Sequence, residues 1–266
     1  MDLQLTGRRA LVTGGSRGIG LAVAQALTAE GVDVAIAARD EVRIRATAAT
    51  LSTTSGRRVV GLTADMADGA SIAQLVAEAT AQLGGIDILV NNAATPGGQA
   101  PPPGLAEVTE EDFRADMDVK VLGYLRCAQA VAPQMVERGW GRIINISGLA
   151  ARQTGSIIGS IRNVAVAALS ANLADELGPR GINVTVVHPG TTRTERTPGV
   201  LANQAAADGV DPAAIEAKLG ARTSIGRIVD ASEVADVVAF LASPRSVAIT
   251  GGAVAVGGGS RGSIHY

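Results

Sequence analysis

The sequence predicts an α/β fold in which helices cover both faces of a parallel β-sheet. Short runs rich in Val and Ile alternate along the chain with longer amphipathic or Ala-rich stretches, which is the pattern of strands joined by right-handed crossover helices. The short runs are largely apolar, as expected for strands that are buried on both faces. No linker, repeat or low-complexity tract divides the 266 residues, so we expect one domain over residues 1–266.

The expected elements follow from this alternation in chain order. The strand-like runs are residues 10–13, 32–37, 58–62, 86–91, 142–146, 182–188 and 253–256. The helix-like stretches are residues 19–30, 41–51, 68–83, 109–138, 157–177 and 231–243. Thr109 and Asp230 each precede an acidic residue by three positions, which is close to a capping box at a helix start. Residues 95–104 and 191–222 are expected insertions after strand ends, at the edge where open parallel sheets bind ligands.

The composition limits the possible classes of function. Two Phe, two Tyr and one Trp are the aromatic residues of a chain that is 47% apolar, so the core is built mainly from aliphatic side chains. This composition argues against a disordered chain, a disulfide scaffold and a stacking platform for single-stranded nucleic acid. With 25 acidic and 23 basic side chains, the net charge is -2. That balance gives no electrostatic reason to expect nucleic acid or an anionic membrane as a partner.

Cysteine and histidine are too scarce to suggest a metal site. The single cysteine, Cys127, cannot form an internal disulfide and is expected to be a small buried core residue. The two histidines and this cysteine are widely separated and give no metal-ligand spacing. The amino-terminal segment lacks the apolar block of a secretory signal, and no run of 18 apolar residues occurs. We therefore expect a soluble cytoplasmic protein without a metal.

Glycines follow the first expected strand at positions that suit an anion site. Residues 13–20 read Thr-Gly-Gly-Ser-Arg-Gly-Ile-Gly and run straight into an expected helix. Gly14, Gly18 and Gly20 permit a tight turn, close approach of the backbone to a pyrophosphate, and close packing of the helix on the strand. The exposed amides at the helix start supply donors and partial positive charge. The preceding strand and following helix provide the context that this motif requires.

Further motifs occur at later strand ends. Asp65 follows the third expected strand, Asn-Asn-Ala-Ala occupies residues 91–94 after the fourth, and Pro-Gly begins residues 189–194 after the sixth. Together with the glycine motif, this series resembles the short-chain dehydrogenase/reductase family over nearly the whole chain. The resemblance implies a Rossmann-type, doubly wound parallel sheet of about seven strands, a nicotinamide dinucleotide cofactor, and a homodimer or homotetramer. The residues then expected to bind the cofactor are Gly14, Ser16, Arg17, Gly18, Ile19, Gly20, Arg39, Asp65, Met66, Asn91, Ala93, Pro189, Gly190 and Thr194.

The residues after the second strand favour NADP over NAD. Enzymes of this family that prefer NAD usually present a carboxylate to the ribose 2'-hydroxyl at about the position of Ala38. That position is small and apolar here, whereas Arg39 and Arg17 are placed to reach a 2'-phosphate, which suits a guanidinium group. The alternative is that Arg39 and Asp40 form a solvated surface pair.

The resemblance also implies catalytic residues that this chain does not have. Family members that transfer hydride share a serine after the fifth strand, Tyr-x-x-x-Lys on the next helix, and an Asn on the helix before. The tyrosine moves the proton, and the lysine lowers the tyrosine pKa from about 10. Ser147 is present, but alignment from the later motif places Gly159 at the tyrosine position and Asn163 at the lysine position. Tyr124 and Tyr266 have no lysine four residues later.

Lys120 stands where the family's active-site Asn is expected. Its alternative interpretation is a surface lysine on a long helix. Our hypothesis is that Lys120, Ser147 and Asn163 line an active site rebuilt without tyrosine, in which Lys120 and Ser147 bind an anionic or carbonyl group of the substrate. In this hypothesis Asn163 still reaches the nicotinamide ribose.

Other residues are weaker candidates. Arg152 and Arg162 are placed to face the same cleft, although Arg162 equally suits a structural role on its helix. His188 is expected to be a buried structural histidine. His265 and Tyr266 form either a frayed tail or a segment that crosses an oligomer interface into a neighbouring cleft.

Three function classes remain open. The first is an NADP-dependent oxidoreductase that acts on a small carbonyl or alcohol with an unusual proton donor. The second is a non-catalytic NADP-binding protein. The third is a lyase or hydrolase that uses the cleft without hydride transfer.

The helix at residues 157–177 contains a run, 164–171, in which nearly every side chain is apolar or small. Such a helix suits burial against a second copy of the chain.

Overall fold

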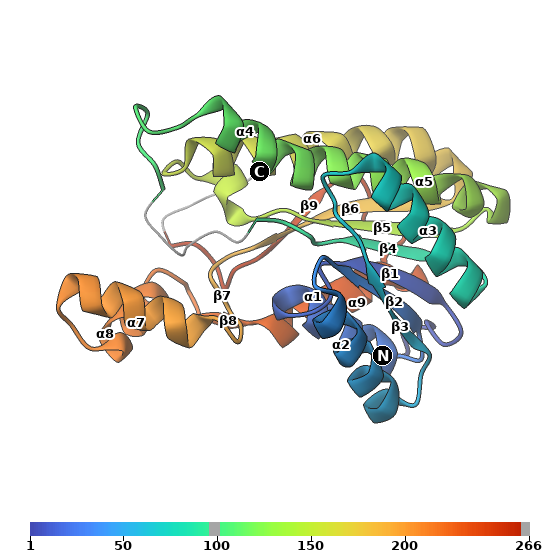
Figure 1. Ribbon diagram of the computed structural model, residues 1–266, viewed down its shortest axis with the longest axis horizontal. Coiled ribbons are helices and arrows are strands. Elements are labelled where there is room, and N and C mark those ends of the chain that lie inside the picture. The colour runs from blue at the N-terminus through green and yellow to red at the C-terminus, as the bar shows by residue number, and fades with distance from the viewer. Residues whose placement is uncertain (96–101, 262–266) are drawn as a thin grey trace.

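A computed structural model describes residues 1–95 and 102–261. Seven parallel strands form one sheet in the order β3-β2-β1-β4-β5-β6-β9. Helices α3, α5 and α6 cover one face, and α1, α2 and α9 cover the other (Figure 1). The predicted Rossmann-type, doubly wound α/β fold is therefore confirmed.

The bounds of the elements lie close to the expected ones. The strands of the main sheet are β1 Arg9–Thr13, β2 Asp33–Ala38, β3 Val59–Thr63, β4 Ile88–Asn91, β5 Gly141–Ile146, β6 Ile182–Pro189 and β9 Ala253–Val256, and β7 Thr192–Arg193 pairs with β8 Val229–Asp230. The helices are α1 Gly18–Ala29, α2 Glu41–Ser55, α3 Gly69–Leu83, α4 Glu110–Met117, α5 Gly123–Arg138, α6 Ile157–Leu177, α7 Thr197–Asp208, α8 Pro212–Gly220 and α9 Ala231–Ala242. Thr109 caps α4 by accepting from the Asp112 amide at 3.1 Å, and Asp230 and Glu233 form a capping box on α9.

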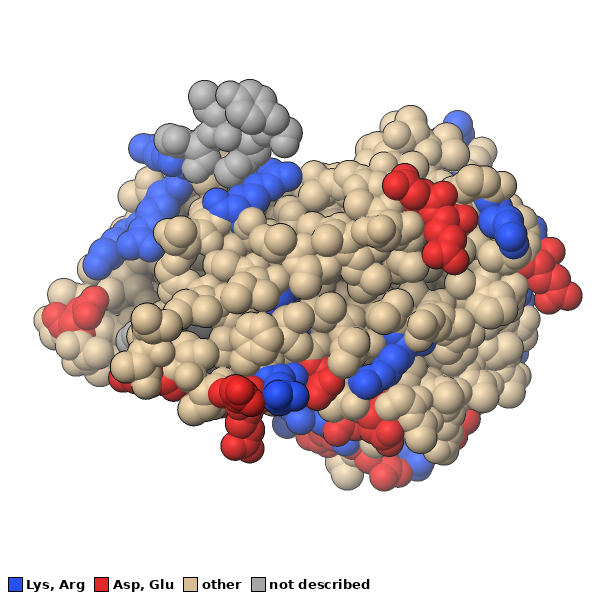
Figure 2. Space-filling view, turned by 90° about the horizontal axis from the view of Figure 1, so that it is seen from above, with Lys and Arg blue, Asp and Glu red and all other residues tan. Residues whose placement is uncertain are grey.

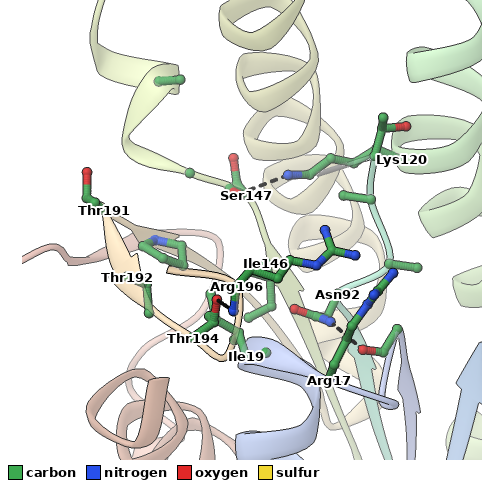
Figure 3. Close-up of a pocket in the computed structure, with 18 of the residues that line it drawn as sticks. Arg17, Ile19, Asn92, Lys120, Ile146, Ser147, Thr191, Thr192, Thr194 and Arg196 are labelled. Carbon is green, nitrogen blue, oxygen red and sulfur yellow. Dashed lines mark hydrogen bonds between the residues drawn. The ribbon is translucent and has the colours of Figure 1, made fainter. Parts of the chain in front are cut away.

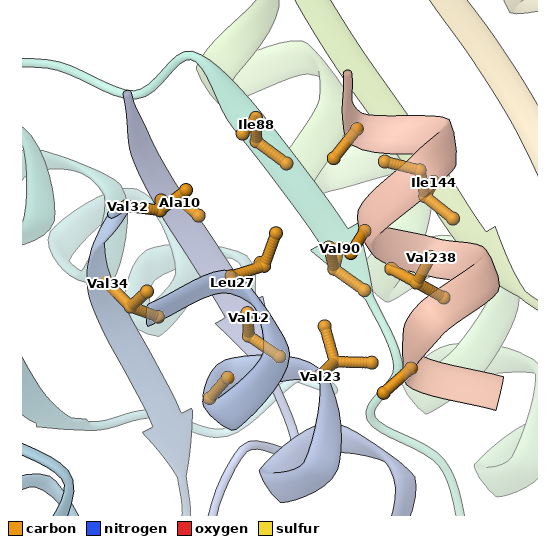
Figure 4. Packing of buried hydrophobic residues seen from close by; sticks show 14 of the residues in the cluster. Ala10, Val12, Val23, Leu27, Val32, Val34, Ile88, Val90, Ile144 and Val238 are labelled. Atoms are coloured by element: carbon orange, nitrogen blue, oxygen red, sulfur yellow. The ribbon is translucent and has the colours of Figure 1, made fainter. Parts of the chain in front are cut away.

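The core consists of two layers, one on each face of the sheet. Alternate residues of β1 show the division, because Val12 packs with α1 and α9 while Leu11 packs with α3 and α5. Figure 4 shows Val23 and Leu27 of α1 against Val12 of β1, with Val238 of α9 beside them. Both layers are aliphatic, which agrees with the scarcity of aromatic residues.

Trp140 lies at the amino-terminal edge of the sheet, directly before β5. The guanidinium carbon of Arg8 lies 3.8 Å from the centroid of the indole ring, and that of Arg142 lies 4.7 Å from it. These distances are within the range of cation–π interactions. The single tryptophan is therefore held at the edge opposite the carboxyl ends of the strands.

Two regions differ from the expected elements. The helix expected over residues 109–138 contains a π-helical turn, Asp118–Leu122, between α4 and α5. Residues 191–222, expected only as an insertion, contain β7 and the helices α7 and α8, which project from one end of the molecule (Figure 1). These helices have a small core of their own, formed by Leu201, Ala205 and Ile215.

Helix α6 is long and mostly apolar. Residues Ile157–Arg180 contain an 18-residue window with a mean hydropathy of 1.4, so they are long and apolar enough to span a membrane by length and composition, a criterion that core helices of globular proteins also meet. In this structure α6 packs along β6. Ile157, Ile161 and Val164 nevertheless remain 40%, 44% and 50% exposed.

Candidate functional site

The glycine motif after β1 forms a tight cradle at the start of α1. Gly14 and Gly18 have φ angles of 67° and 59°, in the left-handed region that favours glycine. A Cβ atom at Gly20 would lie 2.2 Å from the carbonyl oxygen of Gly14, so helix and strand can approach this closely only without that side chain. The predicted roles of the glycines in turning the chain and packing the helix are thus visible in the geometry.

The loop after β4 is tied directly to this cradle. The Asn92 side chain donates to the carbonyl oxygens of Thr13 and Gly14 at 3.1 and 3.2 Å. In return, the Thr13 hydroxyl accepts from the backbone amides of Asn92 and Ala93 at 3.0 and 3.1 Å. These bonds fix the ends of β1 and β4 against each other, at the point where the strand order reverses and open sheets form a ligand crevice.

A cavity of about 1210 Å³ runs from the cradle along the carboxyl ends of the strands. Its size exceeds the typical volume of a drug-sized ligand pocket, about 300–1,000 Å³. Most of the predicted site residues line it: Gly14, Ser16, Arg17, Gly18, Ile19, Arg39, Asp65, Met66, Ala93, Lys120, Ser147, Asn163, Pro189, Gly190 and Thr194. The structure therefore brings these separate sequence motifs into one cleft.

Two predicted cofactor residues lie outside the lining. Gly20 is buried and acts through packing, as described above. Asn91 is fully buried, and its side-chain amide donates to Asn145 Oδ1 at 2.9 Å and to the Tyr124 carbonyl oxygen at 3.4 Å. The Asn91 side chain is thus engaged inside the protein, and the expectation that Asn91 contributes to cofactor binding stays a prediction. Asn92, the next residue of the same motif, lines the cleft instead.

The cradle end of the cleft is strongly basic. Arg17, Arg39, Arg43 and Arg196 line it. Partial burial, followed by the nearby positive charges of Arg196 and Arg43, lowers the pKa of Arg17. Figure 3 shows Arg17 and Arg196 extending from opposite sides into the space between the cradle and Lys120.

A carboxylate from a distant segment of the chain accepts a hydrogen bond from a backbone amide at the start of α1. The Gly18 backbone N–H donates to Glu195 Oε2 at 3.0 Å, and no side chain of the local sequence caps this helix. A carboxylate at this point is a stand-in for an anionic ligand. Together with the space that the glycines leave, it indicates that the cradle fits a phosphate group.

The opposite end of the cleft contains the predicted catalytic cluster. Lys120, in the π-helical turn, is 4% exposed, and its Nζ donates to Asn163 Oδ1 and to the Ser147 carbonyl oxygen, both at 2.9 Å. Figure 3 shows this lysine reaching toward Ser147. The Ser147 hydroxyl donates to the Asn163 carbonyl oxygen at 2.9 Å. Lys120, Ser147 and Asn163 thus form one hydrogen-bonded group, and the prediction that Lys120 enters the cleft agrees with the geometry.

The surroundings of Lys120 favour its neutral form. Burial is the main cause that lowers the pKa of Lys120, to about 7, and the positive charge of Arg162 acts in the same direction. Asp116 opposes this effect but is itself paired with Arg162, whose Nη1 lies 2.5 and 2.6 Å from the two carboxylate oxygens. The hydrogen-bond acceptors of Lys120 within the described residues are neutral oxygens. Lys120 can therefore exchange a proton near neutral pH.

The other candidates have structural roles or cannot be placed. His188 is buried and its Nδ1 accepts from the Gly148 amide at 3.4 Å, while burial, Arg152 and Lys120 lower the pKa of His188 to about 4. Burial raises the pKa of the Cys127 thiol to about 12. His265 and Tyr266 lie outside the described residues. Residues 1–95 and 102–261 contain no cluster of three or more His, Cys, Asp or Glu residues that could hold a metal ion.

Sequence and structure comparisons connect this site to known proteins. A family model described as enoyl-(acyl carrier protein) reductase matches residues 14–261. The short-chain reductase protein NovJ of Streptomyces niveus is 36% identical over 251 residues, which is 94% of this chain and 92% of NovJ.

Solved structures agree with these sequence matches. L-sorbose reductase from Gluconobacter frateurii, complexed with NADPH and L-sorbose, superposes with a TM-score of 0.93 at 28% identity and covers 99% of this chain and 100% of its own. A short-chain dehydrogenase from Burkholderia cenocepacia J2315 in complex with NADP has a TM-score of 0.82 at 36% identity, covering 96% and 98% of the two chains.

Tyr124 supplies a test of whether a tyrosine acts in this cleft. Its hydroxyl is buried and donates to the Ile146 carbonyl oxygen at 3.0 Å, and burial raises its pKa. Tyr124→Phe is expected to lower the free energy of unfolding by about 1–2 kcal/mol, because that carbonyl loses its donor, and to leave kcat/KM within about twofold. Urea denaturation and steady-state kinetics check this. A large loss of turnover at unchanged stability would instead assign the hydroxyl to the reaction.

Proposed function

The chain belongs to the short-chain dehydrogenase/reductase family, and we propose that it is an NADP(H)-dependent oxidoreductase for a small carbonyl or alcohol substrate. The observation that carries this proposal is the single cavity that joins the glycine cradle to Lys120 and Ser147. The cradle suits a dinucleotide pyrophosphate, and the far end presents a buried amine that titrates near neutral pH. The L-sorbose reductase and the Burkholderia dehydrogenase, which share this fold, are complexes with NADPH and NADP.

The cofactor side of the cleft favours NADP. β2 ends at Ala38, where a carboxylate would be needed to accept a hydrogen bond from a free ribose 2'-hydroxyl. Arg17, Arg39 and Arg43 line this part of the cavity and would hold a 2'-phosphate. The phosphate would then offset part of the mutual repulsion of the arginine cluster.

We infer that the reacting end departs from the family pattern by an exchange of side chains between two helices. Asn163 stands at the position of the family lysine on α6, and Lys120 stands at the position of the family Asn. The hydrogen bond of 2.9 Å between Lys120 Nζ and Asn163 Oδ1 joins the two exchanged groups. Gly159, at the position of the family tyrosine, provides no phenol. An amine and a carboxamide are thus both retained, with their positions exchanged.

Lys120 then takes over the proton transfer. When bound, the nicotinamide supplies a hydride to the substrate carbonyl carbon. The carbonyl oxygen gains its proton from the Lys120 ammonium group, which becomes a neutral amine and is reprotonated from solvent. A pKa of about 7 lets Lys120 hold the proton below neutral pH and release it to a developing alkoxide. Lys120 and Ser147 together orient the oxygen.

A non-catalytic NADP-binding protein is the second candidate. The observation that favours it is Gly159, because the usual tyrosine is absent. Binding of NADPH without reduction of any substrate in a broad panel of aldehydes, ketones and oxo acids would support this candidate. Measurable reduction of any member of the panel would exclude it.

A second copy of the chain is the proposed partner. Ile157, Ile161 and Val164 expose a row of apolar side chains on α6. Figure 2 looks onto the side formed by α4, α5 and α6, and charged side chains there gather at the margins of a largely uncharged surface. Such a surface suits a homodimer or homotetramer.

Light scattering at micromolar concentration tests this assembly. The wild-type chain is expected to have the mass of a dimer or tetramer. Val164→Glu is expected to shift the population toward the monomer, because a carboxylate at a buried interface loses its hydration without a partner. A monomeric wild-type chain would contradict the proposal.

Cofactor choice is tested by Ala38→Asp. The wild-type chain is expected to bind NADPH at least about tenfold more tightly than NADH, because a paired phosphate contributes charge-assisted hydrogen bonds. Ala38→Asp should shift this ratio toward NADH by about tenfold or more, since the carboxylate repels the 2'-phosphate and accepts from the 2'-hydroxyl. Ala77→Asp, on the exposed side of α3, controls for the added charge. An unchanged ratio in Ala38→Asp, or a clear NADH preference in the wild type, would overturn the NADP assignment.

The proton donor is tested by Lys120→Met and by the pH profile. Reduction by the wild type is expected to fall as pH rises through about 7, because the neutral amine has no proton to give. The charged groups around this amine are Arg162 and Asp116, and His188 is neutral in this pH range. Lys120→Met should lower kcat by about 100-fold or more while the Kd for NADPH stays within about threefold. Lys218→Met, which removes the other lysine of the chain from the surface of α8, should retain full activity. Retained activity in Lys120→Met would contradict this role.

A further inference from the structure

The contact between Gly18 and Glu195 joins two segments that are far apart in sequence. Glu195 follows β7 and lies in the segment that leads into α7, whereas Gly18 begins α1. The backbone N–H of Gly18 donates to Glu195 Oε2 at 3.0 Å. The first turn of α1 contains no acidic residue, and no local side chain caps it. The negative charge at this helix start therefore comes from the opposite wall of the cleft.

The charges around this carboxylate form an anion site. The start of a helix carries partial positive charge, and the guanidinium groups of Arg17 and Arg196 extend into the same space (Figure 3). The three acidic residues that line the described cleft are Asp40, Asp65 and Glu195. Asp40 accepts from the Arg43 amide at 3.0 Å and Asp65 from the Ala67 amide at 3.0 Å, so both are engaged within their own segments. Glu195 alone among them reaches across to the cradle.

We infer that Glu195 is an internal competitor for the anion site of the glycine cradle, and that its carboxylate leaves Gly18 when the diphosphate of the dinucleotide binds. This inference rests on the proposed function, because it takes the cradle to be the diphosphate site. A backbone N–H has a single hydrogen, so the carboxylate and a phosphate oxygen cannot both bind it at full strength. Two anions so close together would also repel each other. Binding therefore requires Glu195 to move.

This competition affects the cleft in two ways. In the free protein, the contact holds the segment before α7 against the start of α1 and stabilises that arrangement. On binding, this contact must be lost, so the apparent Kd for the dinucleotide equals the intrinsic Kd divided by the fraction of molecules in which Glu195 has left Gly18. The Glu195 carboxylate can also accept again from the Gly18 amide as the diphosphate begins to leave. This contact favours dissociation of the used cofactor.

A purely structural cap makes a different prediction from a competitor. Removal of a structural cap lowers stability in the free and the bound protein alike and leaves affinity unchanged or weaker. Removal of a competitor lowers the stability of the free protein only, and it raises affinity. The two effects have opposite signs, so one pair of measurements separates the two roles.

The test compares Glu195→Gln with the wild type by calorimetric titration of NADPH and by thermal unfolding. Glu195→Gln is expected to bind NADPH about fivefold more tightly, because a neutral amide is a weaker ligand for the helix start than a carboxylate. The Tm of its free protein should fall by about 2 °C, while the Tm at saturating NADPH should match the wild type. An affinity within twofold of the wild type, or a weaker one, would overturn the inference.

Two further variants separate contact from long-range charge. Glu195→Asp keeps the charge but is one methylene shorter, so it is expected to bind Gly18 less well and to tighten NADPH binding by about twofold to threefold. Glu78→Gln removes one negative charge from the exposed surface of α3 and should leave the affinity unchanged. If Glu78→Gln tightened binding as much as Glu195→Gln, the effect would be one of net charge and the inference would fail.

Inorganic pyrophosphate separates this inference from the proposed function. If no variant binds NADPH, the proposed cofactor is wrong, and the titration with pyrophosphate then decides the role of Glu195. Tighter pyrophosphate binding by Glu195→Gln than by the wild type would support the competition. Equal binding, or none by either protein, would overturn it.

Discussion

The close approach of backbone segments between β1 and β4 is the constraint on which the rest of this structure depends. The strand order reverses at β1, so successive crossovers leave a crevice at the carboxyl ends of β1 and β4. Gly20 lets α1 begin directly against the Gly14 carbonyl, and Asn92 bonds to the same turn. A side chain at Gly20 would push α1 away from β1 and separate the cradle from the loop after β4. The position of Ser147 relative to the cradle follows from this arrangement, because Ser147 directly follows β5, which pairs with β4.

The second constraint is the cost of a buried ammonium group. Lys120 is almost completely buried, and its hydrogen-bond acceptors are an amide oxygen and a backbone carbonyl rather than a carboxylate. Neutral acceptors offset only part of the lost hydration, so the pKa falls toward neutrality. A carboxylate partner would have restored an ordinary lysine pKa and fixed the proton. The neutral Asn163 instead leaves that proton exchangeable, as the proposed role of Lys120 requires.

Much of this fold follows from patterns that are local in sequence. Largely apolar strands and glycines between a strand and a helix both have direct physical causes, and α6 begins and ends at the expected residues. Asn91 and Asn92 show the limit, because side chains of neighbouring residues at a strand end point to opposite sides. Asn91 is fully buried and Asn92 lines the cleft, and the motif alone does not tell the two apart. The amino-acid sequence around Lys120 gives no indication of the π-helical turn.

The start of α8 at Asp211-Pro212 does have a sequence signature, since Asp is a good helix cap and Pro suits the first helical turn. The Ala-rich stretch around it, however, has weak apolar periodicity, so the pattern does not predict the helix itself. Glu195 reaches Gly18 only through the tertiary fold, so its contact has no signature in either segment.

The position of Trp140 determines which optical signals this protein can give. Its indole lies between Arg8 and Arg142 at the amino-terminal edge of the sheet. The six residues of β5, about 20 Å of strand, separate it from Ser147 in the cleft. Indole emission therefore reports directly on the far edge of the sheet, and on the cleft only through energy transfer to a bound reduced nicotinamide, whose absorption overlaps that emission. Fluorescence from a reduced nicotinamide ring would arise in a cleft whose lining contains no Phe, Tyr or Trp among the described residues. Trp140, the one tryptophan of the sequence, is consequently the indole donor of any energy transfer to a reduced nicotinamide in the cleft.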